Sequence, residues 1–270
     1  MQSNQINIIP SHQINFIKWD DCIAENENGF IYSTSSYLNA MADNWYGLII
    51  DDHKTIMPLP CRKKFGITYL YTPPFMQQLG LIGNEEIDTN AVIKAVQAFA
   101  SYGNHFFNFK NNFIEHIDTI KKCNNFILDL SSGYENICKN YSTNLQRNIK
   151  KTHAEELQYF ISHDIDETLN LHQQLQAKNI AHVTADDYNR FEKLCVLLKE
   201  KNQCIVRQVK NKSGEILSAA ILFSDNRRIC NIINATTDEG KKMNANHFLI
   251  DNIIQEFAGK NLLFDFEGSN

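Results

Sequence analysis

A glycine followed by two lysines stands between two apolar patterns in the last fifth of the sequence. Residues 229–233 form a short apolar run, and Gly240, Lys241 and Lys242 follow after a polar turn. From about Met243, apolar side chains recur at helical spacing, which predicts a strand, a turn and a helix in that order. The first turn of a helix has unpaired N–H groups and the positive end of the helix dipole, so this turn could bind a phosphate. An ordinary connection with solvated lysines would also contain one glycine.

Two carboxylates, Asp265 and Glu267, alternate with phenylalanines in the next apolar segment. Residues 262–266 (LLFDF) predict a strand, and alternate residues of a strand share one face. A carboxylate that Phe264 and Phe266 partly shield from water could accept a proton from a reacting group. The same pattern is expected if both acids merely lie on the polar side of a strand that runs into a loop.

Three basic residues share one face of another predicted helix. Arg147, Lys150 and Lys151 stand at positions i, i+3 and i+4. A guanidinium can hold a phosphate or a carboxylate through two parallel hydrogen bonds, so this face could bind an anionic acceptor or carrier. Alternatively, the lysines form a solvated face and pair with Glu155 or Glu156.

A loop in the first half carries aromatic and amide groups. Tyr71, Gln77 and Gln78 flank the pair Pro73 and Pro74, which ends a predicted strand. These side chains could line a pocket for an acceptor, or the loop could simply pack between two domains.

Composition excludes several classes of protein. The chain has 270 residues, enough for one large domain or two small ones, and a net charge of -5, so we expect no DNA partner. No apolar run is long enough to span a membrane, and the N-terminal residues lack the pattern of a signal peptide, so we expect a cytoplasmic protein.

Metal binding is not indicated by the cysteines and histidines. The seven cysteines show no Cys-x-x-Cys spacing, and the nine histidines include no His-Glu-x-x-His. We therefore predict reduced, mostly buried thiols and no metal site.

These candidate residues must be positioned by alternating helices and strands. Hydrophobic periodicity predicts helices over residues 11–25, 37–44, 89–101, 134–158 (with a break near 141–143), 166–178 and 184–200, and from 243 onward. It predicts strands over residues 45–50, 55–60, 68–71, 105–109, 125–130, 204–209, 215–223, 228–234 and 262–266.

The sequence contains an internal repeat of one local pattern. Residues 97–109 and 255–266 each read as a helix end (QAFA or QEFA), a glycine and an apolar strand. Any helix-to-strand connection could look similar, but both copies follow several predicted antiparallel strands. The repeat predicts two domains, residues 1–130 and 131–270.

The chain resembles a known family at three places. Residues 145–152 (LQRNIKKT) resemble the R-x-x-[IL]-x-K-A helix of Fem-type (FemAB-like) members of the GNAT acyltransferase superfamily, with Thr152 where alanine is usual. Residues 264–269 (FDFEGS) resemble its D-F-x-G strand end, and residues 71–80 (YTPPFMQQLG) resemble uncharacterised bacterial Fem-like proteins. The resemblance implies an α+β fold of two tandem GNAT-like domains, each a mostly antiparallel sheet flanked by helices. Because the second copy stops soon after its strand, we expect it to lack its C-terminal elements.

The resemblance implies N-acyl transfer. The donor would be acetyl-CoA or another acyl-CoA, with aminoacyl-tRNA as a secondary candidate because the long helical arm of the tRNA-dependent enzymes is not visible. The acceptor would be a small-molecule or cell-wall-type amine. Asp265 and Glu267 would be catalytic, and Arg147, Lys150, Tyr71, Gln77 and Gln78 would bind substrate. The residues expected to bind the carrier are Gly240, Lys241, Lys242, Met243, Asn244, Asn246, Ile232 and Asn234.

Some alternatives stay open. Asn244 and Asn246 could bind the carrier or cap the helix, and a non-catalytic module that binds a ligand or partner remains a rival to the enzyme. The sequence leaves the oligomeric state undetermined.

Overall fold

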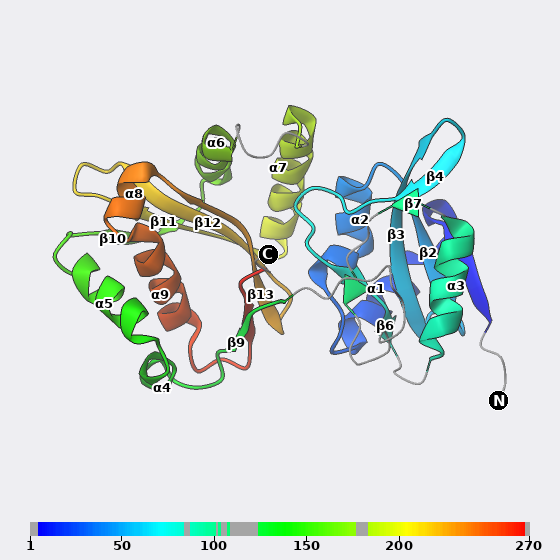
Figure 1. The fold of residues 1–270 in the computed structure, drawn as a ribbon, viewed down its shortest axis with the longest axis horizontal. Helices are drawn as coiled ribbons and strands as arrows, with labels where there is room; N and C mark the ends of the chain where they lie inside the picture. The colour runs from blue at the N-terminus through cyan, green and yellow to red at the C-terminus, as the bar shows by residue number, and fades with distance from the viewer. Residues whose placement is uncertain are drawn as a thin grey trace. The chain divides into compact units, whose positions relative to one another are not determined.

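The chain forms two compact units. The computed structural model describes residues 5–83, 87–100, 102–103, 107–108, 124–176 and 183–267. The units are Met1–Lys122 and Cys123–Asn270 (Figure 1). The strand β9 (Ile127–Asp129) pairs with β14 (Leu263–Asp265) and so belongs to the second unit, whereas the repeat predicts a boundary at residue 130.

The first unit is built on a mostly antiparallel sheet. Its strands lie in the order β1-β2-β3-β4-β7, and β6 also pairs with β3. Their bounds are β1 Ile6–Pro10, β2 Trp45–Ile50, β3 Thr55–Lys64, β4 Ile67–Leu70, β6 Ile82–Gly83 and β7 Tyr102–Gly103. The helices are α1 Phe16–Glu25, α2 Ser35–Met41 and α3 Thr89–Phe99, with short 3-10 helices at Ser11–Gln13 and Ile31–Ser33.

The second unit is built on a second sheet, in the order β10-β11-β12-β13-β14-β9. The further strands are β10 Gln158–Ser162, β11 Cys204–Lys210, β12 Ile216–Ser224 and β13 Arg228–Thr236. Its helices are α4 Tyr134–Lys139, α5 Thr143–Thr152, α6 Ile165–Gln176, α7 Ala185–Glu200, α8 Asp238–Lys242 and α9 Ala245–Phe257. Only the pair β13–β14 is parallel among the pairings described in this sheet.

Both units repeat one arrangement. In each, two antiparallel strands (β3–β4, β12–β13) are followed by a long helix (α3, α9) and then by a strand parallel to the second of the pair (β7, β14). In the second unit, β9 occupies the sheet edge beyond β14, although it precedes the unit's helices in the chain. The predicted strand over 105–109 lies mostly outside the described residues, and Phe107–Asn108 form β8, which pairs with β5 (Leu79–Gly80).

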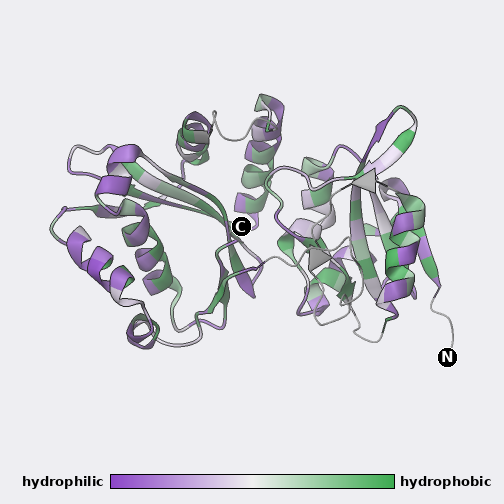
Figure 2. Ribbon diagram, in the orientation of Figure 1, coloured by the Kyte–Doolittle hydropathy of each residue, from purple (hydrophilic) through white to green (hydrophobic). Residues whose placement is uncertain are grey.

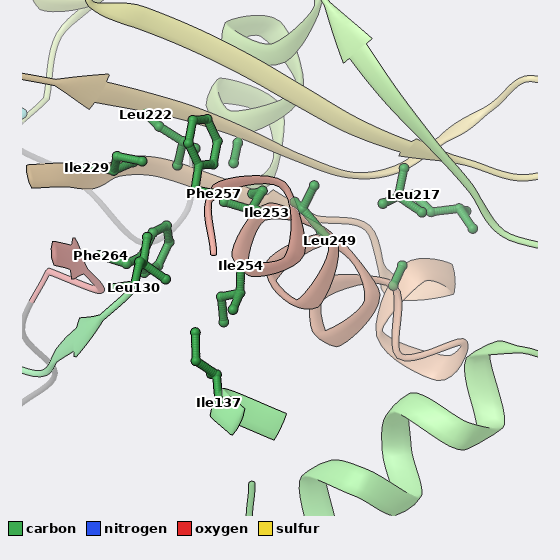
Figure 3. Packing of buried hydrophobic residues seen from close by; sticks show 13 residues of the cluster. Leu130, Ile137, Leu217, Leu222, Ile229, Leu249, Ile253, Ile254, Phe257 and Phe264 are labelled. Atoms are coloured by element: carbon green, nitrogen blue, oxygen red, sulfur yellow. The ribbon is translucent and has the colours of Figure 1, made fainter. Parts of the chain in front are cut away.

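The apolar face of α9 forms the core of the second unit. Figure 3 shows Leu249, Ile253 and Phe257 directed toward the sheet, where Ile229 and Phe264 lie. All five side chains are at least nine-tenths buried. Figure 2 shows hydrophobic residues along the central strands, whereas α5 is mostly hydrophilic. This packing fixes α9 against β13 and β14.

Some predicted elements need correction. The helix predicted over 134–158 is in fact two helices, α4 and α5, with the expected break between them. Residue 158, the last of the predicted helix, is the first residue of β10. The helix predicted over 11–25 is a 3-10 turn followed by α1, and the strand β1 before it was not predicted. Within the described ranges, no helix combines the length and the apolar character needed to cross a bilayer.

Candidate functional site

The second sheet opens between β13 and β14. The two strands pair in parallel only from Arg228 opposite Leu263 to Cys230 opposite Asp265. β13 then continues to Thr236, while β14 ends. Among the residues that the structure describes, the edge of β13 from 231 to 236 therefore has no strand partner on that side, and its backbone groups are available to another extended molecule.

A β-bulge in β13 lies at this opening. Ile233 pairs with Ile221 and Asn231 pairs with Leu222, so Ile232 is an extra residue without a partner of its own on β12. A bulge bends its strand and increases the local twist. The bulge lies just beyond Cys230, the last residue of β13 that pairs with β14, and the predicted carrier residues Ile232 and Asn234 fall on the open stretch.

The two faces of the opening differ in chemistry. Paired residues in a ladder direct their side chains to one face, so Asn231 lies with Leu222 on the face covered by α9. Cys230 pairs with both Phe223 and Asp265 and lies on the opposite face. Phe223 stacks on a phenylalanine of α7, with ring centroids 5.4 Å apart. The sheet face that α9 covers thus carries the Asn231 amide, and the opposite face, toward α7, carries the Asp265 carboxylate.

Two amide oxygens near α9 and β13 are buried without a hydrogen bond. Asn231 Oδ1 and Asn246 Oδ1 accept none from any part of the chain that the structure describes. A buried acceptor without a donor costs about 1–3 kcal/mol, which a ligand N–H or O–H group would recover. Asn244 is the N-cap of α9 with a φ of 55°, and its side chain makes no capping hydrogen bond. Of the two predicted asparagines, neither is seen to cap the helix through its side chain.

Asp265 is held in a buried ion pair. Its side chain is 0% exposed, and its Oδ2 accepts from Arg228 Nη1 at 2.6 Å and from Asn125 Nδ2 at 3.2 Å. Its Oδ1 accepts from the backbone N–H of Glu267 at 3.0 Å. Both oxygens are engaged, which suits Asp265 for holding neighbouring groups in place rather than for accepting a proton.

Glu267 was predicted to share a strand face with Asp265, but it lies beyond the end of the strand. β14 ends at Asp265, and Glu267 has a φ of 58°, so the chain turns there. The turn still brings the Glu267 carboxylate close to Asp265 and Cys230: one ligand atom of each lies within 4.8 Å of the others. Glu267 is partly exposed, whereas the other two are buried.

The Cys230 thiol is buried beside two carboxylates. Burial raises its pKa well above the ordinary value, and the nearby charges of Glu267, Asp265 and Asp225 raise it further, against the opposing effect of Arg228. A protonated thiol is neither a nucleophile nor a metal ligand. A cation bound to this group would have to compete with Arg228 for Asp265.

Gly240 was predicted to lie in an open phosphate-binding turn, but it lies within a short helix. It lies inside α8, a helix of five residues, and its backbone N–H already donates to Thr237 Oγ1 at 2.9 Å. A Cβ at this position would stand 2.2 Å from the backbone oxygen of Leu217. The glycine is thus explained by the close approach of α8 to β12.

The charged residues of α8 do not favour an anion at its first turn. Asp238 and Glu239 occupy that turn, where carboxylates already complement the helix dipole. Lys241 Nζ pairs with Asp238 Oδ1 at 2.8 Å, and Lys242 is exposed. Met243 ends α8, with its N–H donating to Glu239 O. The first turn of α9, which contains no acid, is the remaining candidate for the carrier's phosphate.

We expect Gly240→Ala to destabilise the second unit by about 1–3 kcal/mol, since the new methyl group overlaps backbone rather than a flexible side chain. An alanine in a helix would otherwise stabilise by about 0.5–1 kcal/mol relative to glycine. Gly133→Ala is the matched control, because its Cβ would meet nothing within 4 Å; we expect it to cost about 0.5 kcal/mol or less. Urea denaturation compares them, and equal midpoints for the two variants would contradict the packing role.

The basic face predicted on α5 lies away from the strands. α5 packs against α9, and Arg147, Lys150 and Lys151 are all exposed. Arg147 Nη2 donates to Asn144 Oδ1 at 2.7 Å within the helix. Glu156, a predicted partner of the lysines, instead pairs with Lys212. This face is accessible to a ligand, but no described contact links it to the opening.

Tyr71, Gln77 and Gln78 belong to the first unit. The guanidinium of Arg62 lies 4.1 Å from the centre of the Tyr71 ring, and the Tyr71 hydroxyl accepts from the backbone N–H of Asp43. Gln78 is buried and Gln77 is half-buried. These residues are therefore part of the packing of their own unit.

An open groove of about 720 Å³ runs along β10 and the start of α6. Its lining includes Phe160, Ile161, Asp164, Lys199 and Lys210. None of the predicted site residues lines it, and it lies at the far edge of the sheet from β14.

The comparisons with known proteins concern the fold. No protein-family model matches the sequence, and no curated protein matches it. Among solved structures, FemX is similar with a TM-score of 0.62 at 12% identity, over 97% of this chain and 89% of that one. A conserved protein of unknown function from Bacteroides thetaiotaomicron has a TM-score of 0.57 at 11% identity, over 94% and 88%. The L-PGS structure from Bacillus licheniformis has a TM-score of 0.52 at 12% identity, over 93% and 75%.

The sequence resemblance and the structural neighbours agree, because the similarity to FemX covers both units. Two units, each a mostly antiparallel sheet with flanking helices, are the arrangement that the resemblance implies. The chain has a Fem-like GNAT fold.

Proposed function

We propose that this protein is an N-acyltransferase that moves an acyl group from an acyl-CoA to an amine. The observation that carries the proposal is the open edge of β13 from 231 to 236, which contains the bulge at Ile232. An extended molecule with amide groups, such as the arm of coenzyme A, could pair with this edge as an added strand.

The carrier has further candidate contacts on the same side. Asn231 Oδ1 and Asn246 Oδ1 are buried acceptors that amide N–H groups of the arm could satisfy. The first turn of α9 offers backbone N–H groups and the positive end of the helix dipole to the pyrophosphate. Lys241 and Lys242 stand one turn before α9 and would screen its charge.

The chemical step would take place where β13 and β14 separate. The amine nitrogen attacks the thioester carbonyl carbon, a carbon–nitrogen bond forms, and the carbon–sulfur bond breaks. The nitrogen loses one proton to a base, and the departing thiolate takes up one proton. Glu267 is our candidate base because it is partly exposed at this position, while Arg228 and Asn125 engage Asp265.

The rival is a non-catalytic module that binds a carrier or partner. Two features favour it: Asp265 is committed to an ion pair, and burial raises the pKa of the Cys230 thiol. An aminoacyl-tRNA is the second candidate donor. The acceptor class we propose is a small-molecule or cell-wall-type amine.

A thermal-shift titration with coenzyme A and acetyl-CoA tests the proposal. At a ligand concentration one hundred times the dissociation constant, binding stabilises the folded state by about 2.7 kcal/mol, which raises the melting temperature by several degrees. Asn246→Leu should weaken this response, because leucine is similar in size to asparagine but lacks the buried acceptor oxygen. The matched change Asn252→Leu on α9 should not weaken it, since the Asn252 amide already donates to the backbone oxygen of Phe248.

The outcomes separate the readings. A saturable shift followed by acetylation of amines supports the enzyme, and a shift without turnover on any amine supports the non-catalytic module. No shift with either ligand contradicts an acyl-CoA donor and leads to binding assays with charged tRNA.

A further inference from the structure

The hairpin between β3 and β4 ends in an exposed aromatic residue. Lys64 opposite Ile67 is the last pair, so Phe65 and Gly66 form a two-residue turn. Their φ angles are 52° and 80°. Phe65 is 93% exposed and Ile67 is 52% exposed. In Figure 1 the hairpin projects beyond the other strands of the first unit.

Phenylalanine is a poor choice for this turn on folding grounds. Two positive φ angles define the turn type that favours Asn-Gly or Asp-Gly, and a bulky side chain at a positive φ is an outlier. Phe65 gains almost no burial in return, because it is almost fully exposed. Residues that break a local rule without a gain in the fold are concentrated at functional sites.

Two exposed lysines directly precede this aromatic residue in the hairpin. Lys63 and Lys64 directly precede it and are exposed, and neither forms an ion pair with any described residue. Lys64 Nζ lies 5.8 Å from the centre of the Phe65 ring. Arg62, the next basic residue inward, is already paired with Asp43 at 2.5 Å. The tip is therefore apolar and basic, although the whole chain carries a charge of -5.

We propose that the β3–β4 hairpin tip docks on an anionic lipid surface. Phe65 and Ile67 enter the interfacial layer of the bilayer, and Lys63 and Lys64 contact the lipid phosphates. An aromatic side chain with flanking lysines suits this boundary, which is apolar on one side and negatively charged on the other. This inference does not depend on the acyl-transfer proposal.

The size of the tip favours a lipid surface over a protein partner. A stable protein interface buries about 800 Å² on each side, far more than two apolar side chains at the end of one hairpin provide. A bilayer needs no complementary pocket. The resulting association is weak and reversible, as expected for a single aromatic residue with two charges.

Co-sedimentation of the full chain with vesicles tests the proposal. We expect binding to vesicles of equimolar phosphatidylcholine and phosphatidylglycerol, no binding to phosphatidylcholine alone, and release at high salt, where the Debye length falls to about 3 Å. Phe65→Asn should weaken binding about tenfold, as expected for losing the transfer of one aromatic side chain. The same variant should melt no lower than the wild type, because asparagine suits the turn.

The lysines are tested by charge reversal with a matched control. The double variant Lys63→Glu and Lys64→Glu should weaken binding at least about 25-fold, since each basic residue near an anionic surface contributes about a fivefold effect. The control double variant Lys94→Glu and Lys193→Glu changes the net charge equally at two exposed helix positions. It should bind almost as the wild type does.

Fluorescence gives a second measurement on the same tip. Trp19 and Trp45 are buried, so Phe65→Trp adds one exposed indole against a constant background. Its emission should shift to shorter wavelength on anionic vesicles. The proposal is overturned if the wild type does not sediment with equimolar vesicles, or if Phe65→Asn and the lysine double variant bind as it does. It is also overturned if the wild type is a dimer that Phe65→Asn dissociates, because the tip would then contact a second copy of the chain.

Discussion

Arg228→Ala is expected to lower the free energy of unfolding of the second unit by about 3–5 kcal/mol, the usual cost of removing one partner of a buried ion pair. Asp265 is 0% exposed and Arg228 has 14% of its side chain exposed, so neither charge is well solvated in the fold. Without the guanidinium, the carboxylate would retain only the Asn125 amide and the backbone N–H of Glu267 among the partners described above.

A surface ion pair in the same unit provides the control. Lys212 pairs with Glu156, and both side chains are more than half exposed. Lys212→Ala should cost less than about 1 kcal/mol, because solvent screens an exposed pair. Urea denaturation, with both variants measured beside the wild type, compares the two. Similar midpoints for Arg228→Ala and Lys212→Ala would show that Asp265 does not depend on Arg228.

A double variant tests the mechanism of the loss. If the cost comes from an uncompensated buried charge, replacing both groups by apolar residues should restore much of it. The pair Arg228→Met and Asp265→Leu should therefore be more stable than Arg228→Ala. If the double variant is as unstable as the single one, the loss of stability comes from the packing of these two side chains more than from an uncompensated charge.

The order of elements in the second unit was predictable because its apolar pattern is strong. The positions of α9 and β14 follow from the periodic residues between Phe248 and Phe266. β10 was missed because it is an edge strand: Phe160 and Ile161 are both exposed, and the alternation typical of a half-buried strand is absent. α8 was read as a turn because it is five residues long and contains a glycine.

The site was only partly predictable from the sequence. Asp265 and Glu267 were singled out because they alternate with phenylalanines at the C-terminal end of a predicted strand, and the structure does bring them together with Cys230. Arg228 was missed, since it stands 37 positions from Asp265 and only the parallel register of β13 and β14 brings the two side chains into contact. The bulge at Ile232 was also missed, because a bulge depends on the pairing with β12 and not on local composition.

Glu267→Gln is expected to lower the turnover of amine acetylation by about 10²–10⁴-fold, the usual contribution of a general base, while leaving the affinity for coenzyme A unchanged. This prediction depends on the proposed function. Glutamine keeps the length of the side chain and removes its ability to take a proton. The backbone of Glu267 stays anchored to Asp265 Oδ1, so the fold at this position should be preserved.

The measurements must separate a lost base from a lost binding site. The thermal shift with coenzyme A should be the same in Glu267→Gln and the wild type, and the fall should be in kcat at saturating acetyl-CoA. Glu200→Gln, at an exposed position of α7, is the matched control and should keep full activity. Full turnover in Glu267→Gln would remove this residue from the mechanism. Since Arg228 and Asn125 hold Asp265, the proton would then have to pass directly to water, and the rate would have to come from positioning at the open edge of β13 alone.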